Sequence, residues 1–175
     1  PRLVVTGAIN WDINLFVQDF PRIGEEVPVV KITRVPGGKG ANAAVAAARI
    51  LGKNQVALIG AIGKDEIGRT QLRILRNEHI LTPGIKVSRQ SESGQAYIAV
   101  DNKGRNVIHT LFGANTDITA EDFRNKKISG LVEGSHAVVV IDPPMDAIEE
   151  IISQAWEAGK TVIWDAGVRS KLGLE

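Results

Sequence analysis

Two polar residues, Asn10 and Asp12, follow the apolar run LVV near the start of the chain. The run predicts a buried strand that ends at Gly7, because short Leu and Val stretches bounded by glycine are typical of strands covered on both faces. Open α/β sheets bind their ligands beyond the carboxyl ends of such strands. An amide and a carboxylate placed there can form hydrogen bonds with vicinal hydroxyl groups. The alternative interpretation of the pair is a capped turn.

A glycine-rich stretch, VPGGKGANAAVAAARILG at residues 35–52, carries a second set of candidate residues. Glycine permits close backbone approach, and the unpaired amides at a helix start suit polar ligand oxygens. The stretch lacks the GxxxxGK[ST] spacing of a Walker A loop, and no GxGxxG motif directly follows the first predicted strand. The remaining alternative is a tight turn into a closely packed alanine helix. Three glycines around one lysine exceed what a turn alone needs.

Further carboxylates follow two later apolar runs, at Asp142 in VIDPP and at Asp165 in IWDAG. Because parallel strands share one carboxyl edge, we expect both residues to lie at the same edge as Asn10 and Asp12. Asp65 is predicted to be a helix N-cap. The three histidines lack metal-like or triad-like spacing, so no chemistry is assigned to them.

The elements that would position these residues alternate between strand and helix. Apolar runs predict buried strands at about residues 3–7, 55–63, 136–142 and 160–167, and helices at about residues 41–51, 64–80, 120–123 and 145–159. Two segments interrupt the series. β-Branched stretches at about residues 13–36 predict a small separate sheet, and a hairpin around DNKG at about residues 95–111 predicts a flap. The predicted fold is α/β with a parallel sheet and right-handed crossovers.

The composition limits the classes of function. The 175 residues include 21 Lys and Arg against 20 Asp and Glu, and this balance gives no electrostatic case for a nucleic-acid partner. No apolar run approaches the roughly 20 residues of a membrane span, and no signal-like segment opens the chain, so we expect no membrane partner and a cytoplasmic location. Cysteine is absent, which excludes disulfides and thiol redox chemistry. Small-molecule chemistry is the class that remains.

Taken in order, five segments resemble the N-terminal part of the ribokinase-like, or PfkB, family of carbohydrate and nucleoside kinases: GAINWDI, PGGKGANAAVAAARILG, GAIGKDEIG, SGQAYIAV, and GAN at residues 113–115. The resemblance implies a doubly wound, mostly parallel α/β body. It also implies a small β-sheet lid, built from the two interrupting segments, that closes over a sugar. ATP and Mg²⁺ are the implied cofactors. The resemblance places the catalytic base and the ATP-binding part beyond Glu175, so residues 1–175 would be the N-terminal part of one kinase domain.

The same resemblance implies substrate contacts for six residues at strand ends and in the glycine turn: Asn10, Asp12, Gly38, Lys39, Asn42 and Asp142. Asp142 stands at an acidic position where ribokinase has a glutamate. The segment WDAGVRS is similar to a strand end of some relatives, which makes Asp165 and Arg169 possible further contacts.

The function implied is transfer of the ATP γ-phosphate to a hydroxymethyl group of a pentose or nucleoside. This chain would be the substrate-binding portion, inactive by itself, in a homodimer formed through the lid. Two alternatives remain open. One is a kinase of the same family that acts on a hexose or a sugar acid, with Arg169 contacting the acid. The other is a non-catalytic sugar-binding module that is complete as it stands.

Overall fold

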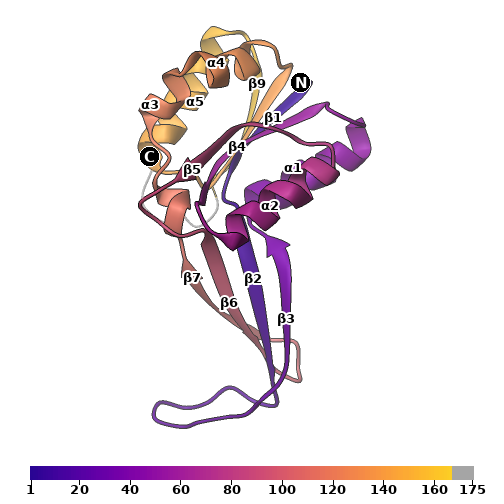
Figure 1. Cartoon of the computed structure of the whole chain (residues 1–175), viewed down its shortest axis with the longest axis vertical. Helices are drawn as coiled ribbons and strands as arrows, with labels where there is room; N and C mark the ends of the chain where they lie inside the picture. The colour runs from indigo at the N-terminus through magenta and orange to yellow at the C-terminus, as the bar shows by residue number, and fades with distance from the viewer. Residues whose placement is uncertain (167–175) are drawn as a thin grey trace.

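The computed structural model describes residues 1–166, which form a layered body and a second sheet that projects from it (Figure 1). The body contains a five-stranded sheet in the order β5-β4-β1-β8-β9, and every pairing in it is parallel. Its strands are β1 (Leu3–Gly7), β4 (Val56–Gly63), β5 (Leu81–Ser88), β8 (Ala137–Ile141) and β9 (Thr161–Asp165).

Helices cover both faces of the body sheet (Figure 1). One face carries α1 (Lys39–Leu51) and α2 (Glu66–Asn77), and the other carries α3 (Ala120–Arg124), α4 (Lys126–Glu133) and α5 (Met145–Glu157). Successive strand residues point to opposite faces, so the sheet supplies two separate cores. Val5 belongs to the core shared with the alanines of α1, whereas Val4 belongs to the core that contains Phe123 of α3.

The direction of winding reverses at β1. From β1 the chain adds β4 and β5 on one side of the sheet, and it later adds β8 and β9 on the other. The fold is therefore doubly wound, as the resemblance implied. A reversal of this kind leaves a crevice beyond the carboxyl ends of the two adjacent strands, and ligands of open α/β sheets bind in that crevice. Asn10 follows β1 closely and Asp142 follows β8 directly, so the two residues flank it.

The projecting sheet, called the lid sheet below, has the order β3-β2-β6-β7. Its strands are β2 (Asn10–Val17), β3 (Val29–Gly37), β6 (Gly94–Val100) and β7 (Asn106–Leu111). It consists of two antiparallel hairpins joined by parallel pairing of β2 with β6. The two segments that interrupt the strand and helix series thus meet in one sheet. Pro28 directly precedes β3, which is an edge strand, where a proline is tolerated.

Some elements differ from the prediction. Helix α1 begins at Lys39, two residues before the expected start at Ala41. The sequence predicted no strand between α2 and the hairpin, but β5 lies there. The sequence of β5, LTPGIKVS, does not have a strand-like pattern, because it contains Pro83 and Gly84. A sheet tolerates these residues in an edge strand such as β5. Neither α4 nor the short 3₁₀ helix η1 (Gly113–Thr116) was predicted.

Asp65 caps α2, as predicted, and it also ties this helix to the lid sheet. Its carboxylate accepts hydrogen bonds from the backbone N of Gly68 at 2.7 Å and from the backbone N and Oγ of Ser93, both at 2.7 Å. Ser93 directly precedes β6. Burial by itself would raise the pKa of Asp65, but the hydrogen bonds from Ser93 and Gly68 outweigh it and hold the pKa below its usual value.

We expect Asp65→Ala to lower the free energy of unfolding at neutral pH by about 1 to 2 kcal/mol, the usual range for a lost N-cap. Because the folded-state pKa is lowered, this contribution is present above the ordinary aspartate pKa and is lost as the pH falls through the lowered one. Urea unfolding of the wild type and the variant across this pH range measures it. A difference between the two proteins that does not shrink on acidification would contradict the assignment.

Candidate functional site

A cavity of about 520 Å³ lies where the lid sheet meets the carboxyl edge of the body sheet. Its wall is formed by Ala8, Asn10, Lys39, Thr110, Phe112, Asn115, Thr116, Asp142 and Pro144. These residues come from the end of β1, the starts of β2 and α1, the end of β7, η1, and the segment after β8. The cavity therefore occupies the crevice between β1 and β8, and its volume suits a small molecule.

Lys39 and Asp142 form an ion pair in the cavity wall, with 2.6 Å between Nζ and Oδ2. The lysine side chain is 55% exposed and the aspartate side chain is 22% exposed. The second carboxylate oxygen of Asp142, Oδ1, is shielded from solvent and has no hydrogen-bond partner among residues 1–166. A shielded acceptor without a partner is costly, so a ligand hydroxyl that donates to Oδ1 would stabilise the site.

We expect Lys39→Met to change the free energy of unfolding by less than about 1 kcal/mol, because solvent-exposed ion pairs contribute little to stability. Affinity for a hydroxylated ligand should instead fall about 3-fold to 10-fold through the loss of one donor. Urea unfolding and calorimetric titration measure the two quantities on the same variant. Arg124→Met, which removes an ion pair with Glu150 outside the cavity wall, is the matched control and should leave affinity unchanged.

Asn10 is held through its side chain and its backbone by two residues that the sequence analysis did not assign. Nδ2 of Asn115 donates to Oδ1 of Asn10 at 2.8 Å, and Nε2 of Gln71 donates to the backbone carbonyl of Asn10. Gln71 is 1% exposed. It lies between Gly68 and Leu75 on the buried stripe of α2, and a polar residue on such a stripe was the available signal.

Asp12 lies beside the cavity, without forming part of its wall. It is two residues from Asn10 on β2, so both side chains face the same side of the lid sheet. Its carboxylate lies against Gly37, and a Cβ on that glycine would overlap it. Burial raises the pKa of Asp12. The carboxylate therefore adjoins the glycine turn, and its role in sugar binding stays a prediction.

The glycine turn packs against the connection between β1 and β2. Gly38 has φ of 92°, and a Cβ there would overlap the carbonyl oxygen of Ala8 and the backbone N of Asn10. Glycine is required for both reasons. The backbone N of Ala41 donates to the Ala8 carbonyl at 3.1 Å. One of the helix-start amides expected to bind a ligand is thus already engaged within the protein.

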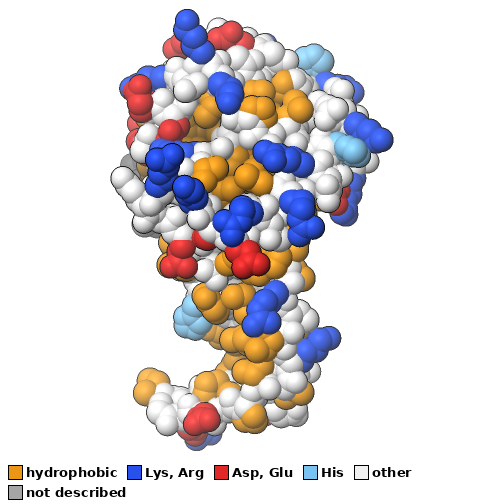
Figure 2. Space-filling view, viewed as in Figure 1, with side chains coloured by type: hydrophobic (Ala, Val, Ile, Leu, Met, Phe, Trp, Pro, Cys, Tyr) orange, Lys and Arg blue, Asp and Glu red, His pale blue; other side chains and the backbone are white. Residues whose placement is uncertain are grey.

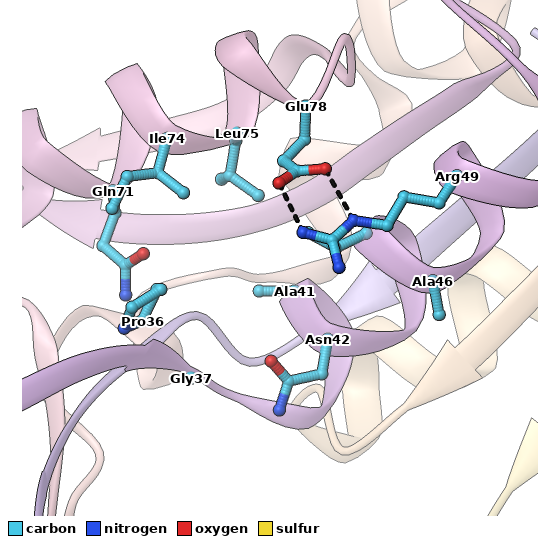
Figure 3. A pocket seen from close by; sticks show the side chains of 11 residues that line it. Pro36, Gly37, Ala41, Asn42, Ala46, Arg49, Gln71, Ile74, Leu75 and Glu78 are labelled. Atoms are coloured by element: carbon cyan, nitrogen blue, oxygen red, sulfur yellow. Dashed lines mark hydrogen bonds and ion pairs between the residues drawn. The ribbon is translucent and has the colours of Figure 1, made fainter.

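Asn42 is not in the wall of this cavity. It is exposed on α1 and lines a separate groove of about 350 Å³ between α1 and α2. Figure 3 shows the groove, closed at one end by Arg49 and Glu78, whose two hydrogen bonds measure 2.9 and 2.6 Å. Gly37 lines the same groove, so Asn42 lies close to the glycine turn but on another side of it. Its role in sugar binding stays a prediction.

Asp165 ends β9 and pairs in register with Ile141, the last residue of β8. It therefore lies at the same sheet edge as Asp142, as the strand-end argument predicted. Arg169 lies outside the described residues.

ATP and Mg²⁺ find no assigned site in the part of the chain that the structure describes. Among residues 1–166, no three His, Asp or Glu side chains gather so as to hold a metal ion. Within the same range, no helix is long and apolar enough to cross a membrane.

A doubly wound parallel sheet, a lid sheet at its carboxyl edge and a cavity between them, with Asn10, Lys39 and Asp142 in its wall, define a lidded α/β protein. The family model described as pfkB family carbohydrate kinase matches residues 1–168. The chain belongs to this family, which confirms the resemblance noted in the sequence.

Individual relatives agree with the family. The chain is 31% identical over 163 residues to ribokinase of Staphylococcus aureus (strain COL), covering 93% of this chain and 53% of that protein. The solved structure of ribokinase from Giardia lamblia has a TM-score of 0.84 at 27% identity and aligns with 93% of this chain and 49% of its own. Arabidopsis thaliana ribokinase complexed with ribose and ATP has a TM-score of 0.82 at 25% identity, with coverages of 95% and 54%. The chain spans about half the length of these relatives.

Proposed function

We propose that the protein is an ATP-dependent kinase that phosphorylates a hydroxymethyl group of a pentose or nucleoside in the cytoplasm, and that this chain supplies the sugar-binding portion. The observation that carries the proposal is the convergence of Asn10, Lys39 and Asp142 on one cavity beyond β1 and β8. Membership of the pfkB family supports it, as do relatives named ribokinase, one of them in complex with ribose and ATP.

The polar groups of the cavity suit a polyol. Carboxylates only accept hydrogen bonds and an ammonium group only donates them, whereas each sugar hydroxyl can do both. Asp142, and Asp12 beside the glycine turn, would accept from hydroxyls, while Lys39 would donate to an adjacent oxygen. Thr110 and Phe112, at the end of β7, bring the lid sheet into the same wall, so lid closure would exclude water from the bound sugar.

In this proposal the described residues bind and orient the sugar, and the groups that hold the nucleotide and take the proton of the attacking hydroxyl lie elsewhere in the protein. ATP would supply the phosphoryl group and Mg²⁺ would neutralise its charge. The chain's own contribution is to fix the hydroxymethyl group relative to the ring hydroxyls, which is the positioning part of catalysis.

We further propose that two copies pair through the lid sheet. One face of this sheet exposes Ile32, Tyr97, Val107 and Leu111, each 39 to 44% exposed. Figure 2 shows hydrophobic side chains gathered along the projecting sheet. Light scattering behind a sizing column should give twice the protomer mass, and Val107→Glu should reduce it to the protomer mass. A wild type that elutes as a monomer at micromolar concentration would contradict the pairing.

The enzymatic proposal is tested with the full-length protein as its genome encodes it. ADP formation with ATP and Mg²⁺ is measured against D-ribose, adenosine, D-fructose and D-gluconate. We expect saturable ADP formation with ribose or the nucleoside, and none from the 175-residue chain alone. Activity only with fructose or gluconate would mean that the substrate is a hexose or a sugar acid and not a pentose or nucleoside. Sugar binding without ADP formation in the full-length protein would instead indicate a binding module.

A further inference from the structure

The side chain of Asn115 links the segment that leads into the lid sheet with the segment that leaves it. The residue is 8% exposed and lies in η1. Its Oδ1 accepts a hydrogen bond from the backbone N of Ile9 at 2.8 Å. Its Nδ2 donates to the carbonyl oxygens of Phe112 at 2.9 Å and Ile9 at 3.2 Å. Ile9 directly precedes β2 and Phe112 directly follows β7, so a single side chain joins the entry to the lid sheet with its exit.

These backbone partners determine which end of the Asn115 amide is the nitrogen. The backbone N–H of Ile9 can only donate, and the carbonyls of Ile9 and Phe112 can only accept. A reversed amide would lose all three hydrogen bonds and would place its oxygen against two other oxygens. The orientation of Asn115 therefore follows from the chemistry of its partners, which is the proper basis for assigning an amide.

The orientation of Asn115 in turn determines that of Asn10. Asn115 presents only an N–H to the Asn10 side chain, at 2.8 Å, so the atom that meets it must be the Asn10 oxygen. A reversed Asn10 would set two NH₂ groups against each other. Nδ2 of Asn10 is left as the free end of the amide, without a partner among residues 1–166, and Asn10 lines the cavity. A ligand therefore meets a donor at this position.

Gly94 and Gln71 also support the fixed orientation of the Asn10 side chain. Gly94 pairs in register with Asn10, and a Cβ at position 94 would overlap both Nδ2 of Asn115 and Oδ1 of Asn10. Glycine at the start of β6 thus leaves room for the contact between the two asparagines. Gln71 holds the backbone carbonyl of Asn10 from α2, so the residue cannot shift to relax its side chain.

We propose that Asn115 is a positioning residue, which locks the Asn10 carboxamide so that Asn10 presents its Nδ2 donor to a ligand in the cavity. The inference rests on the proposed function of the cavity as a sugar site. The Nδ2 donor of Asn10 and the acceptor carboxylate of Asp142 in the same wall suit a hydroxyl that accepts one hydrogen bond while it donates another.

A double-mutant cycle on the full-length protein tests whether Asn115 acts through Asn10. D-Ribose is titrated calorimetrically into the wild type, Asn10→Ala, Asn115→Ala and the double variant. We expect Asn115→Ala to weaken affinity about 5-fold to 10-fold in the wild-type background and less than about 2-fold in the Asn10→Ala background. Equal losses in both backgrounds would mean that Asn115 is merely structural and would overturn the proposal.

A second measurement needs neither a variant nor a ligand. Hydrogen-bond NMR couplings in the labelled wild-type protein should connect ¹⁵Nδ2 of Asn115 with ¹³Cγ of Asn10, and the backbone ¹⁵N of Ile9 with ¹³Cγ of Asn115. The second coupling is the internal control. If it is observed while the first is absent, or if the first runs from Nδ2 of Asn10 to Asn115, the locked orientation is wrong.

The two experiments separate the inference from the proposed function. If the wild type binds ribose and the affinity losses of the two single variants add up in the double variant, only the positioning role of Asn115 is refuted. A wild type that binds no pentose, nucleoside, hexose or sugar acid removes the proposed function, and the NMR couplings still decide the orientation of Asn10.

Discussion

Gly40→Ala is expected to lower the free energy of unfolding by about 3 kcal/mol, the upper part of the range for overpacking a core. A Cβ at position 40 would overlap the backbone of Gly7, and a Cβ on Gly7 would overlap both Gly40 and the carbonyl oxygen of Ile141. The two glycines thus mark the place where α1 crosses the end of β1. Because β1 is paired on both sides, with β4 and β8, its backbone cannot move aside without breaking sheet hydrogen bonds.

The same substitution at Gly130 is the matched control and should have the opposite sign. Gly130 lies inside α4, and a Cβ there would have no described heavy atom within 4 Å apart from its chain neighbours and the nearby backbone of its own helix. Alanine should raise the free energy of unfolding by about 0.5 to 1 kcal/mol, because it restricts the unfolded chain and favours the helix. Urea unfolding measures the free energy of unfolding of both variants. If Gly40→Ala is as stable as the wild type, the close crossing of α1 over β1 is wrong.

Asp12→Ala is expected to weaken the binding of a pentose by about 1 to 3 kcal/mol, or roughly 5-fold to 150-fold. The carboxylate is partly shielded against Gly37, so a hydrogen bond to it from a sugar hydroxyl would be stronger than one made in open water. Calorimetric titration of the full-length protein measures the loss. Asp19→Ala removes an exposed carboxylate from the connection between β2 and β3, and it should leave affinity unchanged. Unchanged affinity in Asp12→Ala itself would remove the assignment.

Removing the charge of Asp12 should weaken sugar binding but should not lower the free energy of unfolding. Burial raises the pKa of Asp12 in the folded protein, so its charge disfavours folding at pH values above that pKa, and the penalty disappears as the pH falls below it. Asp12→Asn should therefore match or exceed the wild type in free energy of unfolding at neutral pH, while it still weakens sugar binding. A variant that loses both stability and affinity would indicate a structural role.

The parts of the fold that sequence predicted well are those with uninterrupted local patterns. The apolar runs of β1, β4 and β8 and the alanine-rich α1 show their structure within a few residues. The edge strand β5 does not, because Pro83 and Gly84 weaken its signal and only its pairing with β4 makes it a strand. That pairing depends on tertiary structure, which no local pattern reports.

The same distinction applies to the candidate site. Asn10 and Asp142 could be brought together from sequence, because parallel strands share a carboxyl edge whatever their separation along the chain. Asn115 and Gln71 could not. Their hydrogen bonds reach backbone groups 106 and 61 residues away, at a junction that exists only once the lid sheet has formed. Their own sequence neighbourhoods predict nothing about those partners.

A crystal structure of the full-length protein with D-ribose tests most directly whether the crevice between β1 and β8 is a sugar site. We predict the sugar in the cavity lined by Asn10, Lys39 and Asp142, with one hydroxyl within hydrogen-bond distance of Nδ2 of Asn10 and another of Oδ1 of Asp142. Ribose bound instead in the groove between α1 and α2, beside Arg49 and Glu78, would contradict this.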